Sequence, residues 1–525
     1  MNLNLMKQLL LITFLFCCNF LHAQVQKLGE LSSGTLVSSS IIYDDETNDV
    51  YGYFLLYRND RMSRETYQAE YVILDKNLNK VNSNTFNQSS YKFFMASVKF
   101  ELNYVKKMGD KLFIALIDKI YQGPEQYATF NNYVNPRFRV LDLNTYELSD
   151  EKVLINNTFK DRIFKENEVT YIEDFIDNQY ILKTNGNYLL SFATPEHNPK
   201  MTLGLPSDKK NNSIKSFSVF DENLNLKWTQ KINQTKDEFY EYNLIFSGQK
   251  HFILLKKHAK SLKKNYDLYS YEEGFIKAIN LDDIDFGSEI EDVIFENDKI
   301  LLFTKNYKKN KKHHDYSQLL SFSKITLDFK GNQINKQTAT WTDLTRDITF
   351  ENPSGKIKNY GKLEVVDFVS LEDDTTIFVL EGYKSGKHTE LLDLFIAKMD
   401  KDFQLEYFNK IEKNKTEFKN INADGSYLKR RGAFDYIYHQ KLDDEGNLVF
   451  FYVNNIKEGS KIQKRKNPEW ILGIITYVDG EFNYDKLQLT NKDSKIIPGK
   501  AKNGYIRLLE YDDEDVEIRL EKINY

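Results

Sequence analysis

The sequence predicts an all-β protein, a β-propeller of seven or eight blades, each blade a sheet of four antiparallel strands. A turn centred on aspartate recurs along the chain, and repetition on this scale is typical of repeat architectures. The 525 residues include 34 tyrosines and 37 phenylalanines but 8 prolines, which suits long strands because proline cannot donate to a sheet. No long stretch has the periodicity of an amphipathic helix, so strands are expected throughout.

The recurrent turn follows an apolar run and carries aspartate beside asparagine, glycine or a charged residue. Aspartate suits such a turn because its side chain accepts hydrogen bonds from the backbone that follows it. We expect these turns to join the third strand of a unit to the fourth. They occur at Asp75, Asp142, Asp221, Asp328, Asp400 and Asp479.

A second family of turns divides the chain into eight units, because each turn precedes a dense apolar run typical of a buried strand. These turns lie at Thr47, Gly109, Asn185, Gly248, Asn297, Asp373, Glu445 and Asn503. The sixth unit shows the four strands most clearly, at about 363–371, 376–383, 391–399 and 403–411. If units four and five share a blade, the ring has seven blades. A row of separate sandwiches fits the regular spacing less well.

The two ends of the chain are expected to close the ring. The last unit, from about residue 496, has material for three strands, and residues 27–37 have material for one. Pairing the N- and C-terminal strands would complete the last blade and remove the free sheet edges.

Residues 1–23 are expected to be a signal peptide. Lys7 precedes an apolar core, and Ala23 suits the position before a cleavage site, although an uncleaved anchor is the alternative. Cys17 and Cys18 both lie in this segment, so the mature protein would contain no cysteine. We therefore expect residues 24–525 to form one exported β-propeller domain, periplasmic or secreted, without a transmembrane segment.

The hairpin that ends in Trp228 resembles the outer hairpins of quinoprotein-type propellers. With the segment that ends at Ala23 and Gln24, the whole pattern resembles uncharacterised exported β-propeller proteins of Bacteroidota. The resemblance implies a fold and a location in the cell envelope, and no activity. Only one of the six aspartate turns carries the tryptophan, so neither a quinone nor another cofactor is expected.

No catalytic motif is present in the sequence: a nucleophile elbow, a zinc-protease helix and a phosphate-binding glycine loop are all absent. The histidines lack metal-ligand spacing, and His313 and His314 lie in a lysine-rich loop, so no metal site is predicted. Acidic clusters such as 372–374 and 443–445 are interpreted as hairpin turns. The alternatives are calcium ligands or the acid–base pair of a glycosidase.

The loops expected between second and third strands are basic, and in a propeller all of them emerge on one face. The net charge of −5 argues against nucleic-acid binding but permits a local basic surface. We predict that this surface binds an anionic glycan or an acidic envelope protein. Its candidate residues are Lys256, Lys257, Lys260, Lys308, Lys309, Lys311, Lys312, Lys464, Arg465 and Lys466.

Two functions are compatible with the sequence. The absence of a catalytic motif favours a non-enzymatic binding or scaffold module of the cell envelope. The alternative is a propeller glycoside hydrolase or polysaccharide lyase with its site in the central channel. An enzyme would bring carboxylates, histidine or tyrosine from the inner strands together near the ring axis, whereas a binding module would leave them scattered.

Overall fold

The computed structural model describes most of the chain between Gln24 and Ile523. The residues that it does not describe within these limits are 46, 64–65, 90–91, 94–95, 123–128, 132–136, 154–169, 172–178, 183–187, 194–200, 203–204, 207–215, 224, 233–239, 259–263, 282–285, 297, 310–313, 420–421, 456–469, 490–494 and 512–514.

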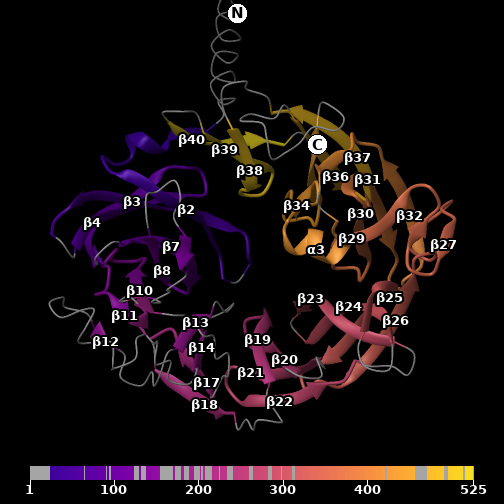
Figure 1. The fold of residues 1–525 in the computed structure, drawn as a ribbon, viewed down its shortest axis with the longest axis horizontal. Helices are drawn as coiled ribbons and strands as arrows, with labels where there is room; N and C mark the ends of the chain where they lie inside the picture. Colours follow the sequence, from indigo (N-terminus) through magenta and orange to yellow (C-terminus); the bar gives the residue numbers. More distant parts are fainter. Residues whose placement is uncertain are drawn as a thin grey trace, which may run out of the picture.

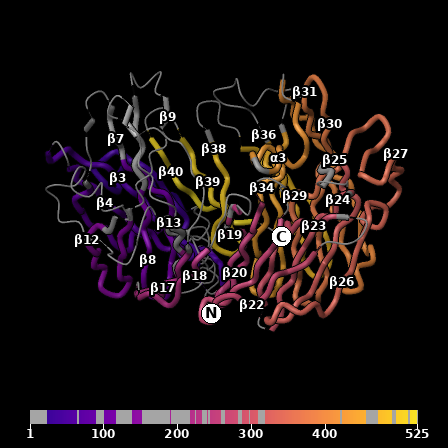
Figure 2. Tube along the Cα trace, turned by 60° about the horizontal axis from the view of Figure 1, so that its bottom comes forward, coloured from indigo at the N-terminus to yellow at the C-terminus, as the bar shows by residue number. Residues whose placement is uncertain are grey.

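Eight sheets of at least four strands follow one another along the described chain and stand side by side in a ring (Figures 1 and 2); their strands pair antiparallel except for β11 and β12. We number these sheets one to eight in chain order. Six of them have four strands, and sheets two and six have seven within the described residues. The predicted all-β propeller of four-stranded antiparallel blades is confirmed.

The first four sheets lie in the N-terminal half. Sheet one comprises β2 (Thr35–Tyr43), β3 (Val50–Arg61), β4 (Thr66–Asp75) and β5 (Lys80–Ser89). Sheet two comprises β6 (Lys92–Phe93), β7 (Ala96–Met108), β8 (Lys111–Gln122), β9 (Thr129–Asn131), β10 (Arg137–Asp142), β11 (Lys152–Val153) and β12 (Thr170–Tyr171). Sheet three comprises β13 (Gln179–Leu182), β14 (Tyr188–Ala193), β17 (Ser216–Asp221) and β18 (Leu226–Lys231), beside the separate pair β15 (Met201–Thr202) and β16 (Leu205–Pro206). Sheet four comprises β19 (Tyr240–Ser247), β20 (His251–His258), β21 (Lys264–Ser270) and β22 (Gly274–Ile279).

The other four sheets follow the same order. Sheet five comprises β23 (Phe286–Phe295), β24 (Lys299–Lys309), β25 (His314–Asp328) and β26 (Gln333–Thr340). Sheet six comprises β27 (Phe350–Asn352), β28 (Lys356–Ile357), β29 (Gly361–Ser370), β30 (Thr376–Lys384), β31 (His388–Met399), β32 (Leu405–Ile411) and β33 (Thr416–Lys419). Sheet seven comprises β34 (Tyr436–Lys441), β35 (Leu448–Asn455), β36 (Trp470–Val478) and β37 (Glu481–Gln488). Sheet eight comprises β38 (Lys495–Lys500), β39 (Tyr505–Tyr511), β40 (Val516–Lys522) and β1 (Gln24–Lys27).

Apolar side chains fill the spaces between neighbouring sheets. Buried clusters in the described residues join every successive pair around the ring, including sheet eight to sheet one. Between sheets five and six, for example, the rings of Phe303 and Phe368 lie 4.3 Å apart beside buried Trp341. The continuous apolar runs of the second strands are therefore explained, because these strands are covered on both faces.

The six aspartate turns all follow the third strand of a sheet, as predicted. In the turn at Asp75, the carboxylate accepts hydrogen bonds from the backbone nitrogens of Asn77 and Asn79, at 2.7 and 2.9 Å. The turns at Asp221 and Asp328 repeat this arrangement. The pattern recurs in the sequence because the carboxylate satisfies the backbone of its own turn, whereas Asp479 and Gly480, with φ of 51° and 85°, form a two-residue hairpin turn.

Pairing of the chain ends is confirmed, but the terminal strand lies earlier than 27–37. Strand β1 pairs with β40, with Gln24 opposite Leu520, and Leu28 is buried directly after it. Residues from Thr35 onward belong instead to β2, the inner strand of sheet one. The prediction merged two segments because the short helix η1 (Leu28–Glu30) and the turn after it separate them without a strong turn sequence.

Three features of sheet six and its exit were missed by the sequence analysis. Strands β27 and β28 form a hairpin before the inner strand, and β33 pairs with β31 after β32 ends. Helix α3 (Gly425–Arg430) then lies beside β29 on the way to sheet seven (Figure 1). None of the helices in the described part of the chain is long and apolar enough to cross a membrane.

Candidate functional site

A β-bulge recurs at equivalent positions of the inner strands, and the side chains that follow it contribute to the candidate site. In six inner strands the register against the second strand slips by one residue, at Val37, Asn103, Ile245, Glu291, Val366 and Ile437. A bulge turns the following side chain out of the regular alternation, and such positions are frequent beside active sites. In sheets five, six and seven, the residues that follow it are Asp292, Asp367 and Tyr438.

Asp367 is the centre of a polar cluster between sheets six and seven. Its Oδ2 atom lies 2.6 Å from Nδ1 of His439 and accepts a short hydrogen bond from the Tyr436 hydroxyl. Its Oδ1 atom accepts a hydrogen bond of 2.9 Å from the backbone nitrogen of Phe368. Burial acts to raise the pKa of Asp367, but the hydrogen bonds from His439 and Tyr436 outweigh it and lower the pKa. Asp367 is therefore ionised, and the neutral tautomer of His439 that fits this contact has its hydrogen on Nδ1 and Nε2 free to accept.

Asp292 occupies the equivalent place on the neighbouring inner strand but has the opposite electrostatic environment. Burial, with a contribution from the negative charge of Asp367, raises the pKa of Asp292 to about 6. Its Oδ1 atom accepts a hydrogen bond from the backbone nitrogen of Val293, the same contact that Asp367 makes with Phe368. One carboxylate is held ionised and the other retains a proton to higher pH, as in the acid–base pairs of enzymes.

Two lysine side chains, Lys429 and Lys305, lie close to the strands that carry Asp292 and Asp367. Nζ of Lys429, on α3, donates to Glu291 and, at 3.2 Å, to the carbonyl oxygen of Val365. Lys305, buried on β24, lies 2.6 Å from Glu364 and 3.3 Å from Glu291. The positive charge of Lys429 acts to lower the pKa values of both Asp292 and Asp367. Helix α3 therefore contributes charge to the site as well as contacts with β29.

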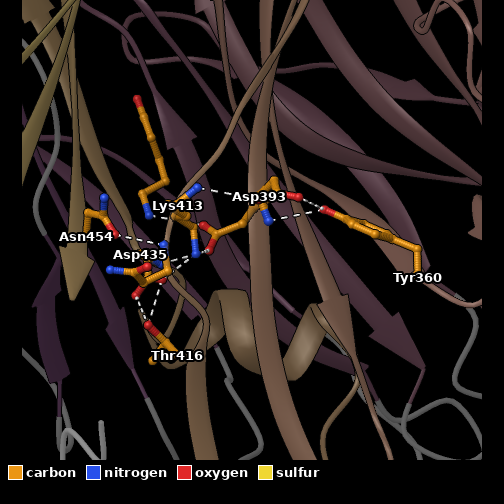
Figure 3. Close-up of polar contacts among 9 residues, drawn as sticks. Tyr360, Asp393, Lys413, Thr416, Asp435 and Asn454 are labelled. Atoms are coloured by element: carbon orange, nitrogen blue, oxygen red, sulfur yellow. Dashed lines mark hydrogen bonds and ion pairs between the residues drawn. The ribbon is translucent and has the colours of Figure 1, made fainter. Parts of the chain in front are cut away.

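A buried ion cluster holds the start of β34, from which Tyr436 projects (Figure 3). Nζ of Lys413 lies 2.5 Å from Asp435 and 3.2 Å from Glu381, and Thr416 donates a hydrogen bond to Asp435. Glu381 in turn accepts hydrogen bonds from the backbone nitrogens of Asp435 and Tyr436. The cluster thus fixes the backbone that presents Tyr436 to Asp367.

A pocket of about 480 Å³ opens beside His439, where the inner strands end. His439, Lys500 and Tyr43 come from the strands, and the turns of sheets one, six, seven and eight supply the rim. The acidic clusters 372–374 and 443–445 lie near this rim as turns, as predicted. The Asp373 carboxylate binds the backbone of Thr375, and that of Asp443 binds the backbone of Glu445.

The predicted basic surface is only partly described. Lys256 and Lys257 lie on β20, and Nζ of Lys256 lies 4.3 Å from the centre of the Tyr240 ring. Lys308 is exposed near the end of β24, next to Lys309. The other six candidates lie outside the described residues: Lys260, Lys311, Lys312, Lys464, Arg465 and Lys466. Binding at this surface therefore stays a prediction.

Sequence reasoning missed Asp292, Asp367, Tyr436 and His439 because nothing near each residue marks it as functional. The available indication was an aspartate inside an apolar inner strand, a few residues before the turn, in two successive units. Among the described residues, no group of three or more histidine, aspartate or glutamate side chains is placed to hold a metal ion.

Comparison with solved structures finds similar folds at low similarity. Polysaccharide lyase Uly1 is 9% identical over 80% of this chain and 89% of its own, with a TM-score of 0.35. The α-L-arabinofuranosidase arb93a of Fusarium graminearum is 9% identical over 66% and 92%, with a TM-score of 0.31. Cobalt-substituted ACO of Synechocystis is 9% identical over 58% and 62%, with a TM-score of 0.30, so less than two thirds of its length is covered. These likenesses concern the fold alone.

Comparison with protein sequences gives a more specific result. No curated protein matches the chain. The profile of one family, described as a family of unknown function (DUF6770), matches residues 6–173 and 387–524, which together exceed half of the chain. The second matched segment contains Tyr436 and His439, and the first ends before Asp292 and Asp367. The chain therefore belongs to this family of unknown function, DUF6770.

Proposed function

We propose that the protein is an enzyme that cleaves a glycan by acid–base catalysis at the inner-strand cluster. The observation that carries the proposal is the pair Asp292 and Asp367, which occupy equivalent bulge positions and have pKa shifts of opposite sign. His439, beside Asp367, also lines the pocket, so the cluster borders the pocket through His439. The proposal replaces the non-enzymatic module as the favoured function, because inner-strand groups converge instead of being scattered.

The residues have distinct roles in this proposal. His439 is the general base: Asp367 orients it, and Nε2 takes a proton from water in hydrolysis or from carbon in β-elimination. In hydrolysis, the water oxygen bonds to the anomeric carbon as the bond from that carbon to the leaving oxygen breaks. In elimination, the electrons of the broken C–H bond form a C=C bond as the bond from carbon to the leaving oxygen breaks. Asp292 is the general acid in both reactions and gives its proton to that oxygen.

The test is a cleavage assay on a panel of neutral and acidic polysaccharides with the purified protein. Newly formed reducing ends report hydrolysis and elimination alike, whereas ultraviolet absorbance of an unsaturated product reports elimination alone. Replacing either the base or the acid, as His439→Gln or Asp292→Asn, should lower kcat by about 100-fold or more. Asp402→Asn, an exposed turn substitution, should leave it unchanged. Full activity in His439→Gln, or no cleavage of any glycan, would favour the binding module instead.

Asp292→Asn should also stabilise the protein at high pH. Because the pKa of Asp292 is raised to about 6, ionisation opposes folding, and native stability falls as the pH rises from about 4 to about 6. Asparagine removes this loss, so the variant should gain about 3 kcal/mol at pH 8 and nothing at pH 4. Denaturant unfolding of both proteins at the two pH values measures the difference. An equal effect at both pH values would mean that Asp292 is not held protonated.

We further propose that the chain is exported and that the basic loops attract an anionic partner, such as a glycan or an acidic envelope protein. Mass spectrometry of the mature N-terminus should find Gln24, and an intact Met1 would contradict cleavage.

Replacing Lys308, Lys309, Lys311 and Lys312 with serine should weaken capture of envelope components at low salt. It should have little effect at high salt, where the charges are screened. Equal recovery with both proteins would leave the loops as ordinary solvated surface.

A further inference from the structure

Six buried polar atoms without a hydrogen-bond partner belong to sheets seven, eight and one in the described part of the chain, and three of them are Oδ1 of Asn59, Oε1 of Gln88 and Nε of Arg519. The other three are Nε of Arg507, the hydroxyl of Tyr53 and the hydroxyl of Tyr438. They come from strands β39, β3 and β34. Buried polar atoms are normally paired, and an unpaired buried group is costly, so a cluster of them points to a missing ligand.

The Tyr53 and Tyr438 hydroxyls belong to one group with Arg507. Its guanidinium carbon lies 5.8 Å from the centre of the Tyr53 ring. The positive charge of Arg507 acts to lower the pKa values of Tyr53, Tyr438 and Tyr43, although burial raises all three. Within the described residues, no carboxylate pairs with Arg507 and no acceptor meets its buried Nε. The groups on which Arg507 acts here are tyrosines, not carboxylates.

The backbone of β38 is built to let Arg507 reach this position. Arg507 lies opposite Gly499 in the pairing of β38 with β39. A Cβ atom at Gly499 would lie 2.4 Å from Nη2 and 2.9 Å from Nε of Arg507, so the guanidinium occupies the space that a side chain would fill. Glycine at this position leaves the arginine lying across the inner strand.

The group borders the pocket beside His439. Tyr43 and Lys500 line that pocket, and Nζ of Lys500 lies 6.0 Å from the centre of the Tyr438 ring. Burial lowers the pKa of Lys500, and among the charges near it the carboxylate of Asp367 has the opposite effect. The other acidic group that acts on the cluster is Asp75, near Tyr53. Lys500 therefore lines the pocket and lies near the ring of Tyr438, while Arg507 lies near the ring of Tyr53.

We infer that Arg507, Lys500, Tyr53 and Tyr438 form a binding site for an oxyanion group carried by the glycan substrate. The inference rests on the proposed function for the identity of the ligand, and on the unpaired atoms for its charge. Guanidinium groups and hydroxyl groups both donate hydrogen bonds, which a carboxylate or sulfate group accepts at several oxygens. The substrate class is then an acidic glycan, with uronate or sulfated residues, rather than a neutral one.

The proposed oxyanion site explains the arrangement of the pocket. Sugar hydroxyls can donate to the acidic turns at the rim while the anionic group lies at the inner end, next to His439. If the anionic group is a uronate carboxylate, binding to two cations acidifies the carbon–hydrogen bond adjacent to it, which His439 would break in β-elimination.

Binding of small probes to the full-length purified protein tests the inference without measuring catalysis. Glucuronate and glucose 6-sulfate should raise the Tm in proportion to their concentration, and glucose should not. Arg507→Met and the double variant Tyr53→Phe with Tyr438→Phe should each weaken glucuronate binding by at least about tenfold in calorimetry. Arg519→Met is the control, because Arg519 lies on the neighbouring strand β40 and, although its Nε also has no hydrogen-bond partner, its guanidinium lies 3.7 Å from Glu510 and 3.5 Å from Glu521. It should bind as the wild type does.

The failures of the two proposals can be told apart. His439→Gln should keep its affinity for glucuronate while losing cleavage. If Arg507→Met does not fold, Gly499→Ala gives the second measurement, since the added methyl group should displace the guanidinium and weaken binding. Equal binding of glucose and glucuronate would overturn the oxyanion site and leave the acid–base cluster untouched. Binding of free sulfate but of neither charged sugar would overturn the assignment to a glycan.

Discussion

Replacing Lys413 with methionine should lower the free energy of unfolding by about 3–5 kcal/mol. The Lys413 side chain is fully buried between two buried carboxylates, with Asp435 at 2.5 Å and Glu381 at 3.2 Å. Methionine retains most of the volume but removes the positive charge, so two acidic groups would remain uncompensated in the interior. Removing one member of a buried ion cluster is costly for this reason, although the intact cluster adds little net stability.

The size of this effect should depend on pH. Burial raises the pKa of Glu381, and loss of Lys413 should raise it further, because the lysine charge opposes that rise. When the pKa of a carboxyl group is raised in the folded state, the free energy of unfolding falls as the pH increases. The variant should therefore be less stable at pH 8 than at pH 5. Denaturant unfolding at both values measures this.

Lys410→Met is the control, since Lys410 is 44% exposed and pairs with Asp393 and Glu412 at the surface. Its cost should lie within about 1 kcal/mol. Equal costs at positions 410 and 413 would contradict the description of a buried charge cluster.

Deleting residues 24–30 should destabilise the whole ring. The deletion removes β1 and with it the pairing partner of β40, which becomes an exposed edge prone to aggregation. It also removes Leu28, which is fully buried between sheets eight and one and whose burial contributes about 1.5–3 kcal/mol. The carbonyl oxygen of Leu28 accepts a hydrogen bond of 2.7 Å from the Tyr57 hydroxyl, so a buried donor would lose its partner. Thermal unfolding and light scattering of the two proteins give the comparison.

Two single substitutions separate the causes. Leu28→Ala should cost about 2–5 kcal/mol through lost packing, with the pairing of β1 intact. Val25→Ala should be nearly neutral, because Val25 is 51% exposed on the same strand. A deletion variant that melts like the full-length protein would show that the ring does not need its terminal strand.

The sequence was sufficient for features that depend on local chemistry. The turn at Asp75 could be located because the aspartate binds the backbone of its own turn, whatever surrounds it. The buried second strands could be located because a strand covered on both faces contains a continuous apolar run, as residues 377–380 of β30 do. Both properties are contained in fewer than ten consecutive residues.

The candidate site could not be located in this way because it depends on alignment between sheets. Asp292 and Asp367 become neighbours only when β23 and β29 stand side by side with their bulges at one level. His439 contributes because β34 continues the same circle, and Arg507 reaches its position because of a glycine on a different strand. No single segment contains these relations, so the binding module was the natural first interpretation.

Closure of the ring by β1 sets an order of events during synthesis. Gln24 lies opposite Leu520, so β1 is synthesised first but can pair only after β40, which is nearly the whole chain away, has been synthesised. Contacts of such sequence separation form late, because the entropy of closing the loop opposes them until the intervening sheets have formed. Until that moment both flanks of the ring present unpaired strand edges, and the unfinished chain is the state most exposed to aggregation and to holding by chaperones. The cluster beside His439 then forms in an already ordered arc of sheets, while the proposed oxyanion site, which spans sheets seven, eight and one, is completed only as the ring closes.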